Sequence, residues 1–242
     1  MKMLSFARRT LKEILRDPLT LLFGLGFPSV LILLLSAIQA NVPVSLFEIN
    51  SLAPAMTVFG LSFITLFSAT LIAKDRESAL LMRLYATPMT AADFILGYTL
   101  PILPIALAQS AVCFLVGAML GLKLTVNVLY ALLFVLPVSL FFIGLGLLFG
   151  SILNQKQVGG ICGAMLTNLT AWLSGIWFDL SLVGGTFLKI AKVLPFYHAV
   201  ELERAVYAGD FTEILPRLLW ILAYAVATIA LAVILFLRQM KK

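Results

Sequence analysis

Long runs of apolar residues, separated by short polar connections, make up most of this chain. Crossing the hydrocarbon core of a bilayer takes about 20 helical residues, and six of the runs approach or exceed that length. The pattern therefore predicts an all-α integral membrane protein with six transmembrane helices in a single domain, 1–242. The runs cover residues 19–38, 53–73, 93–120, 125–152, 158–177 and 218–237.

The first 17 residues show a different pattern, in which apolar and basic side chains fall on separate sides of a helix. This is typical of an amphipathic helix that lies in the headgroup layer. Both the charged part and the apolar run after it are longer than in a signal peptide. The apolar side holds Leu4, Ala7, Leu11, Ile14 and Leu15, and the basic side holds Arg8, Arg9, Lys12 and Arg16.

The connection between the second and third runs, residues 74–90, concentrates charge in a chain that has little of it. Its first ten residues include three basic and two acidic side chains. We expect a short helix that ends before Pro88, because proline disfavours helical backbone in the preceding residue. Thr90 and Asp93 then have the spacing that caps the next helix. The apolar stripe of this short helix is expected to hold Leu80, Leu81, Leu84 and Tyr85.

One other connection is long. Residues 178–217 have apolar side chains at helical spacing and are broken by Gly184-Gly185 and by Pro195. The pattern predicts two short helices that meet at Pro195 and dip back toward the membrane as a re-entrant hairpin. Backbone at that depth must be covered by protein or by a wet cavity.

The charge of the chain supports this membrane topology. Only 12% of the residues are charged, against about 25% in soluble domains. The net charge is +6, but the sequence shows no basic, aromatic-rich face of the kind that binds nucleic acid. Of the 17 Lys and Arg residues, twelve lie on the side of the termini and of residues 74–90, and five on the other. The positive-inside rule thus places both termini and residues 74–90 in the cytoplasm.

Ionisable residues are absent from the interiors of the six runs. Ion-coupled transporters and pumps use such groups to draw energy from a gradient. Energy for uphill transport would therefore have to enter from outside the bilayer, and the charged segment 74–90 is the obvious place to receive it. The chain has no G-x-x-x-x-G-K-[ST] sequence, so we do not expect it to hydrolyse ATP itself.

The remaining residues form no convincing catalytic or metal-binding group. Cys113 and Cys162 lie within apolar runs and are interpreted as buried thiols, because the sequence has no Cys/His cluster. An intramembrane protease would need a nucleophile and a base in contact. Ser174 and His198 are the one conceivable pair, and we expect His198 to have a structural role at the outer interface.

Several uncharged polar residues and small residues lie inside the runs. The polar ones could form hydrogen bonds between helices, or Gln109, Thr167 and Asn168 could face a path for an amphipathic substrate. Gly146/Gly150 and Gly159/Gly163 have the spacing that lets helices approach closely, either within the chain or in a dimer.

Four features in sequence order resemble one known family. They are the basic helix ending in RDP, the six runs, the segment DRESALLMRLYATPMTAADFILG, and the stretch PFYHAVELERAVYAGDF before the last run. Together they resemble the permease subunit of a type-2 ABC exporter, over essentially the whole chain. LYATPMT resembles the family's ATP-[LM]-[ST] segment, whereas Glu77-Ser78-Ala79-Leu80 departs from its E-x-x-G-T-L pattern.

The resemblance implies a transmembrane subunit that is not an enzyme and binds no cofactor or metal. A separate ATP-binding subunit would bind ATP and Mg²⁺, and two permeases, identical or paralogous, would pair in the lipid of a bacterial cell membrane. The cargo would be hydrophobic or amphipathic: a drug, antibiotic, lipid or glycan. The coupling helix would contact the ATP-binding subunit through Glu77, Arg83, Leu84, Thr87 and Pro88, and the first helix would be a connecting helix carrying Arg8, Arg9, Lys12 and Arg16.

The main alternative is a passive channel or a membrane scaffold for another complex. A channel needs rings of charged or carbonyl groups around a pore, and the sequence offers no candidate ring. Composition alone does not separate a scaffold from an exporter.

Overall fold

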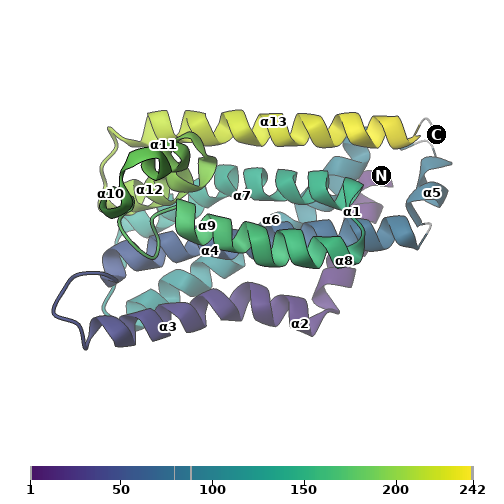
Figure 1. The fold of residues 1–242 in the computed structure, drawn as a ribbon. Coiled ribbons are helices and arrows are strands. Elements are labelled where there is room, and N and C mark those ends of the chain that lie inside the picture. Colours follow the sequence, from purple (N-terminus) through teal and green to yellow (C-terminus); the bar gives the residue numbers. More distant parts are fainter. Residues whose placement is uncertain (1, 79, 88, 241–242) are drawn as a thin grey trace.

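The computed structural model describes residues 2–78, 80–87 and 89–240, which form long helices lying side by side (Figure 1). One end of this bundle carries α1, α5, α8 and the end of α13, and the other carries α10, α11 and α12. The helices are α1 (Lys2–Leu15), α2 (Pro18–Leu21), α3 (Phe27–Gln39), α4 (Ile49–Glu77), α5 (Leu80–Tyr85), α6 (Ala91–Met119), α7 (Val126–Ile152), α8 (Gln155–Val158), α9 (Thr167–Leu173), α10 (Leu180–Val183), α11 (Gly185–Val193), α12 (Pro195–Ala208) and α13 (Ile214–Met240), with π-helical segments η1 (Leu22–Gly26) before α3 and η2 (Gly159–Leu166) before α9.

The all-helical membrane class is confirmed for the described residues, whereas the number of crossings is only partly matched. Five helical segments are long and apolar enough to cross a membrane: Leu22–Gln39, Ile49–Glu77, Ala91–Met119, Val126–Ile152 and Ile214–Arg238. The fifth predicted run is not among them. It forms η2 and α9 after the polar helix α8, and it ends at Leu173. Figure 1 shows α8 and α9 in line beside α4.

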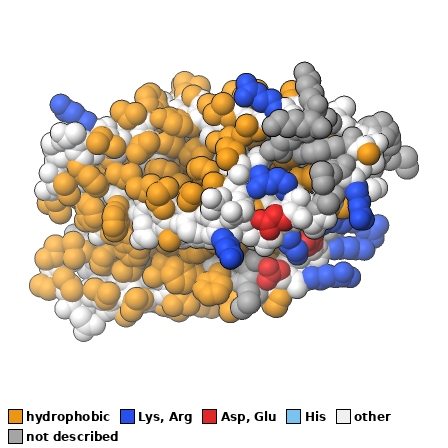
Figure 2. Space-filling model, turned by 45° about the vertical axis from the view of Figure 1, so that its right-hand side comes forward, with side chains coloured by type: hydrophobic (Ala, Val, Ile, Leu, Met, Phe, Trp, Pro, Cys, Tyr) orange, Lys and Arg blue, Asp and Glu red, His pale blue; other side chains and the backbone are white. Residues whose placement is uncertain are grey.

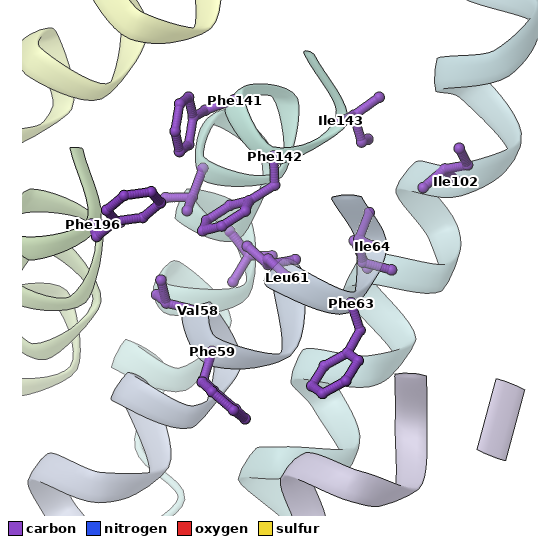
Figure 3. Packing of buried hydrophobic residues seen from close by; sticks show 14 of the residues in the cluster. Val58, Phe59, Leu61, Phe63, Ile64, Ile102, Phe141, Phe142, Ile143 and Phe196 are labelled. Atoms are coloured by element: carbon purple, nitrogen blue, oxygen red, sulfur yellow. The ribbon is translucent and has the colours of Figure 1, made fainter. Parts of the chain in front are cut away.

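Helix α4 is the centre of the bundle and is buried over most of its length. It contacts α3, α6, α7, α12 and η2. Figure 3 shows apolar side chains of α4 meeting those of α6, α7 and α12. The rings of Phe141, Phe142 and Phe196 lie 5.0–6.2 Å apart, in edge-on or tilted pairs. The middle of the bundle is therefore filled by close-packed side chains.

The close approach of α4 and α7 depends on two glycines of α7. A Cβ atom on Gly146 would lie 2.4 Å from Ser68 Cβ, and one on Gly150 would lie 2.7 Å from the Ala69 carbonyl oxygen. The Thr65 hydroxyl also donates a hydrogen bond to the Phe142 carbonyl across this contact, at 2.7 Å. The spacing of Gly146 and Gly150 thus serves packing within the chain.

Replacing Gly146 with alanine should destabilise the bundle. The new methyl group would overlap Ser68 Cβ and the backbone of Thr65, and such overpacking typically costs about 1–3 kcal/mol. The midpoint of unfolding in detergent should fall accordingly. Gly160→Ala is the matched control, because a Cβ there meets nothing within 4 Å. Equal midpoints for the two variants would contradict this account of the α4–α7 contact.

At the other end of the bundle, α12 is packed between longer helices. Its apolar face includes Phe196, Val200 and Val206 and is buried against α4, α7 and α13. Arg204 ties it to its surroundings by donating to the Ser51 carbonyl at 3.2 Å and the Gly175 carbonyl at 3.1 Å. Helix α11 ends at Val193, where the Trp220 and Tyr224 side chains of α13 both donate to its carbonyl oxygen at 3.0 Å.

Candidate functional site

Charged side chains gather at one end of the bundle, in contrast to its apolar flank (Figure 2). Many of them belong to α1 and to the end of α4. Three consecutive residues at the end of α4, Asp75, Arg76 and Glu77, bond to three different parts of the chain. We call these three residues the 75–77 junction. It lies immediately before α5, the short helix of the predicted coupling segment.

Asp75 holds α1 and α6 to the end of α4. Its carboxylate is 1% exposed and accepts both nitrogens of the Arg9 fork, each at 2.6 Å. The Tyr98 hydroxyl donates to the same carboxylate at 2.8 Å. Glu13 extends the network by pairing with Arg9 at 2.5 Å and with Lys74 at 2.9 Å. A bidentate pair of this kind fixes the orientation of the arginine and adds charge-assisted hydrogen bonds.

Hydrogen bonding to Asp75 raises the pKa of Arg9 above its ordinary value, despite partial burial of the guanidinium. Arg9 therefore remains positively charged at any physiological pH. The bond between α1 and α4 is thus an ion pair with a nearly buried carboxylate, which is harder to replace than an ion pair at an open surface.

An aromatic contact reinforces this attachment. Phe6 of α1 packs edge-on against Tyr98, with ring centroids 4.9 Å apart, and against Phe94 at 5.9 Å. The ring reaches this place because α6 has glycine below it: a Cβ on Gly97 would lie 2.3 Å from the Phe6 ring. Phe6 was not among the residues expected on the apolar side of the first helix.

The first helix has three sides rather than the two that were predicted. Phe6 and Ile14 lie on the buried side: Phe6 packs against α6, and Ile14 lies near Phe67 and Leu71 of α4. Leu4 and Leu15, expected on that apolar side, are 63% and 57% exposed. The basic side is mostly exposed, except that Arg9 turns inward to Asp75; its other members are Arg8, Lys12 and Arg16.

Arg76 and Glu77 attach the end of α4 to the turn between α7 and α8. The Arg76 guanidinium donates to the carbonyl oxygens of Ser151 and of Leu153, the latter at 2.5 Å, and so satisfies free carbonyls at the end of α7. Glu77 accepts from the Gln155 backbone at 3.0 Å and from its side-chain amide at 2.8 Å. Glu77, expected to contact a partner subunit, thus already has a partner within the chain.

The segment expected to be one helix over 74–90 is divided. Residues 74–77 continue α4, and the separate helix α5 covers only Leu80–Tyr85. Leu81 is buried and Leu84 is half-buried, which seats α5 against α4, whereas Arg83 is exposed. The Thr87 hydroxyl donates to the Leu84 carbonyl at 2.6 Å. Pro88 and the side chain of Tyr85 lie outside the described residues.

The next helix begins as predicted. Thr90 accepts from the Asp93 backbone at 3.3 Å, and Asp93 accepts from the Thr90 backbone at 2.8 Å. This reciprocal cap fixes the start of α6 and the end of the segment that carries α5.

The three residues considered for a substrate path do not share one surface of the chain. Gln109 is fully buried and lies against Gly60 of α4. Thr167 is also buried and donates to the Cys162 carbonyl at 3.2 Å. Asn168 alone is exposed, with its amide donating to the Ala164 carbonyl at 2.8 Å.

Ser174 and His198, the one pair weighed for a protease, are engaged separately. The Ser174 hydroxyl donates to the Ala171 carbonyl at 3.4 Å. Nε2 of His198 bonds to the Lys192 carbonyl at 2.8 Å, and its ring packs 5.1 Å from Trp220. Within the described residues, neither side chain bonds to the other.

Comparison with known proteins bears on this arrangement. A search of the curated proteins gave no match. The family model described as "ABC-2 type transporter" matches residues 2–207, a range that includes α1, α5 and the 75–77 junction. Because the match covers most of its length, the chain belongs to the ABC-2 type transporter family and is a membrane component of an ABC transporter.

Proposed function

We propose that this chain is the permease of an ATP-driven exporter and that α5 couples it to a separate ATP-binding subunit. The observation that carries the proposal is the attachment of α5 to the 75–77 junction. A force on α5 would reach α1 and α6 through Asp75, α7 through Arg76 and α8 through Glu77. Rigid elements joined in this way move as a body rather than singly.

The surface of α5 suits contact with another protein. Arg83 is exposed and makes no ion pair within the described part of the chain. Thr87 follows on the same exposed segment, whereas Leu81 holds the helix in place from beneath. Glu77 is already bonded to Gln155 of α8. We therefore assign the main polar contact with the ATP-binding subunit to Arg83.

The cargo path would lie between two permease copies, because the middle of one chain is filled by apolar side chains (Figure 3). The exposed amide of Asn168 on α9 supports this placement, since an uncharged polar group in a membrane helix prefers a protein or wet surface to lipid. We propose that Asn168 lies beside the path, that the buried Thr167 supports the helix behind it, and that Gln109 stabilises the contact of α6 with α4. An apolar protein surface with few polar groups favours hydrophobic or amphipathic cargo.

The proposed topology has six crossings, with α8, η2 and α9 forming the fifth. Both ends of the chain would then lie in the cytoplasm, as the excess of Lys and Arg predicts. Figure 1 supports an even number of crossings, because α1 and the end of α13 lie at the same end of the bundle. Helices α10, α11 and α12 would lie at the outer face.

Reversing the charge of Arg83 should uncouple the transporter without unfolding the permease. Arg83→Glu removes one exposed contact, and losing a central interface contact costs upwards of about 1.4 kcal/mol, which is about tenfold in affinity. The permease should still insert, but capture of a coexpressed ATP-binding subunit and ATP-dependent export in vesicles should both fall by at least about tenfold.

Lys189→Glu is the matched control, since Lys189 is also exposed but lies on α11, at the other end of the bundle. It should leave both measurements unchanged. Undiminished capture and export with Arg83→Glu would refute the assignment of α5. Concentration of a solute by the permease alone, driven by a proton or sodium gradient, would refute ATP coupling altogether.

A further inference from the structure

An open hollow of about 900 Å³ lies on the basic side of α1, bounded by the start of α2 and by Lys74 of α4. Five basic and two acidic side chains line it, so it has a positive excess. Arg9 and Lys74 are occupied by the carboxylates of Asp75 and Glu13. The other three basic residues make no ion pair within the described residues: Arg8, Lys12 and Arg16.

A narrower crevice of about 70 Å³ adjoins this hollow and runs between α1 and α4. The two spaces share Glu13, Asp17 and Lys74. The walls of the crevice beyond them are mainly apolar, formed by Ile14, Phe67, Thr70 and Leu71. A positively charged space therefore continues directly into an apolar one.

This pair of spaces lies at the expected level of lipid headgroups. Lys74 directly follows the apolar run of α4, and Pro18 begins the helix that leads into the first apolar segment. Leu4 and Leu15 of α1 are exposed beside the basic side. A helix with adjacent apolar and basic sides is typically seated at a membrane surface, with leucines toward the acyl chains and cations toward phosphates.

We propose that the hollow and the crevice together bind one anionic phospholipid. The headgroup would lie at Arg8, Lys12 and Arg16, and the first methylene groups of an acyl chain would enter the crevice beside Phe67. An acidic protein surface would match the cations but would leave the crevice and the exposed leucines without a partner. The leaflet concerned, the cytoplasmic one, rests on the topology under the proposed function. Anionic lipid is drawn to basic residues on that side, each worth about fivefold in binding.

The test uses the full-length permease alone, in a neutral detergent, so it does not depend on an ATP-binding subunit. Phosphatidylglycerol or phosphatidylcholine with identical acyl chains is added, and bound lipids are counted by native mass spectrometry. The wild type should bind one phosphatidylglycerol in preference to phosphatidylcholine, and added salt should weaken that preference. The triple variant Arg8→Gln, Lys12→Gln, Arg16→Gln should lose binding on the order of 100-fold.

The control triple, Lys123→Gln, Lys189→Gln, Lys192→Gln, removes the same charge at the other end of the bundle and should bind like the wild type. Equal binding of both lipids by the wild type, or unchanged binding by the first triple, would overturn the proposal. Equally tight binding of free glycerol phosphate would overturn the role of the crevice. Should the first triple variant not fold, the single variant Lys12→Gln is tested instead. It should bind phosphatidylglycerol about fivefold more weakly than the wild type, and added salt should weaken binding by the wild type.

Loss of a coexpressed ATP-binding subunit by the first triple, with lipid binding intact, would assign the basic side to that protein and overturn the lipid site. Conversely, lipid binding as expected together with undiminished export by Arg83→Glu would refute the coupling role of α5 and leave the lipid site standing. The two proposals therefore fail separately.

Discussion

Replacing Asp75 with alanine should detach α1 from the bundle and lower the free energy of unfolding by about 2–3 kcal/mol. The change removes the two Asp75 oxygens that accept from the Arg9 fork and from the Tyr98 hydroxyl, and leaves Arg9 paired with Glu13. A fully buried pair would cost more, but Arg9 is 37% exposed and can turn to water. Trypsin should cleave α1 faster in the variant. Arg8, Lys12 and Arg16 are already exposed, but a helix that separates from the bundle unfolds locally more often and then offers its backbone to the protease.

Two further variants show how much of this loss of stability comes from one hydrogen bond and how much any lost ion pair would cause. Tyr98→Phe removes one hydrogen bond and should cost about 1 kcal/mol. Glu213→Gln removes an acid from an exposed ion pair with Arg217 and should change stability by less than about 1 kcal/mol. Unfolding and cleavage of the Asp75→Ala variant at wild-type rates would show that Phe6 alone holds α1 in place.

Much of the fold follows from local sequence pattern. The apolar runs predict the five long helical segments to within a few residues, except that α4 begins earlier and continues through the charged residues to Glu77. The cap formed by Thr90 and Asp93 was predictable because its two partners lie three residues apart. The close helix contact at Gly146 and Gly150 was also indicated by spacing, although spacing did not identify α4 as the partner.

The attachment of α1 was not predictable in the same way. Periodicity marks a buried face only when another face is polar, and α4 is buried all round. Asp75 therefore looked like part of a solvated charged segment, whereas its partner Arg9 is 66 residues away. One signal was available: Phe6 falls on the same side of the first helix as Ile14, and Gly97 offers space for an aromatic ring.

The division of segment 74–90 has a similar cause. Charge suggested that the membrane helix ends near residue 73, because solvated residues usually begin a connection. In the structure the three residues of the 75–77 junction find partners on α1, α7 and α8 and are thereby held in helical form to Glu77. Contacts between distant segments, rather than local propensity, set this helix end.

Burial of Glu203 was not predictable from the pattern either, because two other charged residues, Glu201 and Arg204, lie close to it in the sequence. It is fully buried on α12, and neither carboxylate oxygen has a hydrogen-bond partner within the described residues. Arg204 and Glu201 bond to each other and to other groups instead. Burial raises the pKa of Glu203 well above its ordinary value, so the folded chain favours the neutral carboxyl more strongly than the unfolded chain does.

The contribution of Glu203 to stability should therefore fall as the pH rises above about 5. The unfolded chain loses the Glu203 proton near pH 4.5, whereas the folded chain retains it, so deprotonation favours unfolding by up to about 1.4 kcal/mol per pH unit. Burial lowers the pKa of His198, which acts in the opposite direction as the pH falls through about 6.5. Comparing wild type and Glu203→Gln at each pH cancels that contribution.

The variant should gain stability relative to the wild type steadily from pH 5 to 8, measured by unfolding in detergent, and the exposed-site variant Glu213→Gln should not. A constant difference between wild type and Glu203→Gln across this range would mean that Glu203 is ionised in the folded chain, and that a counter-charge or water reaches it.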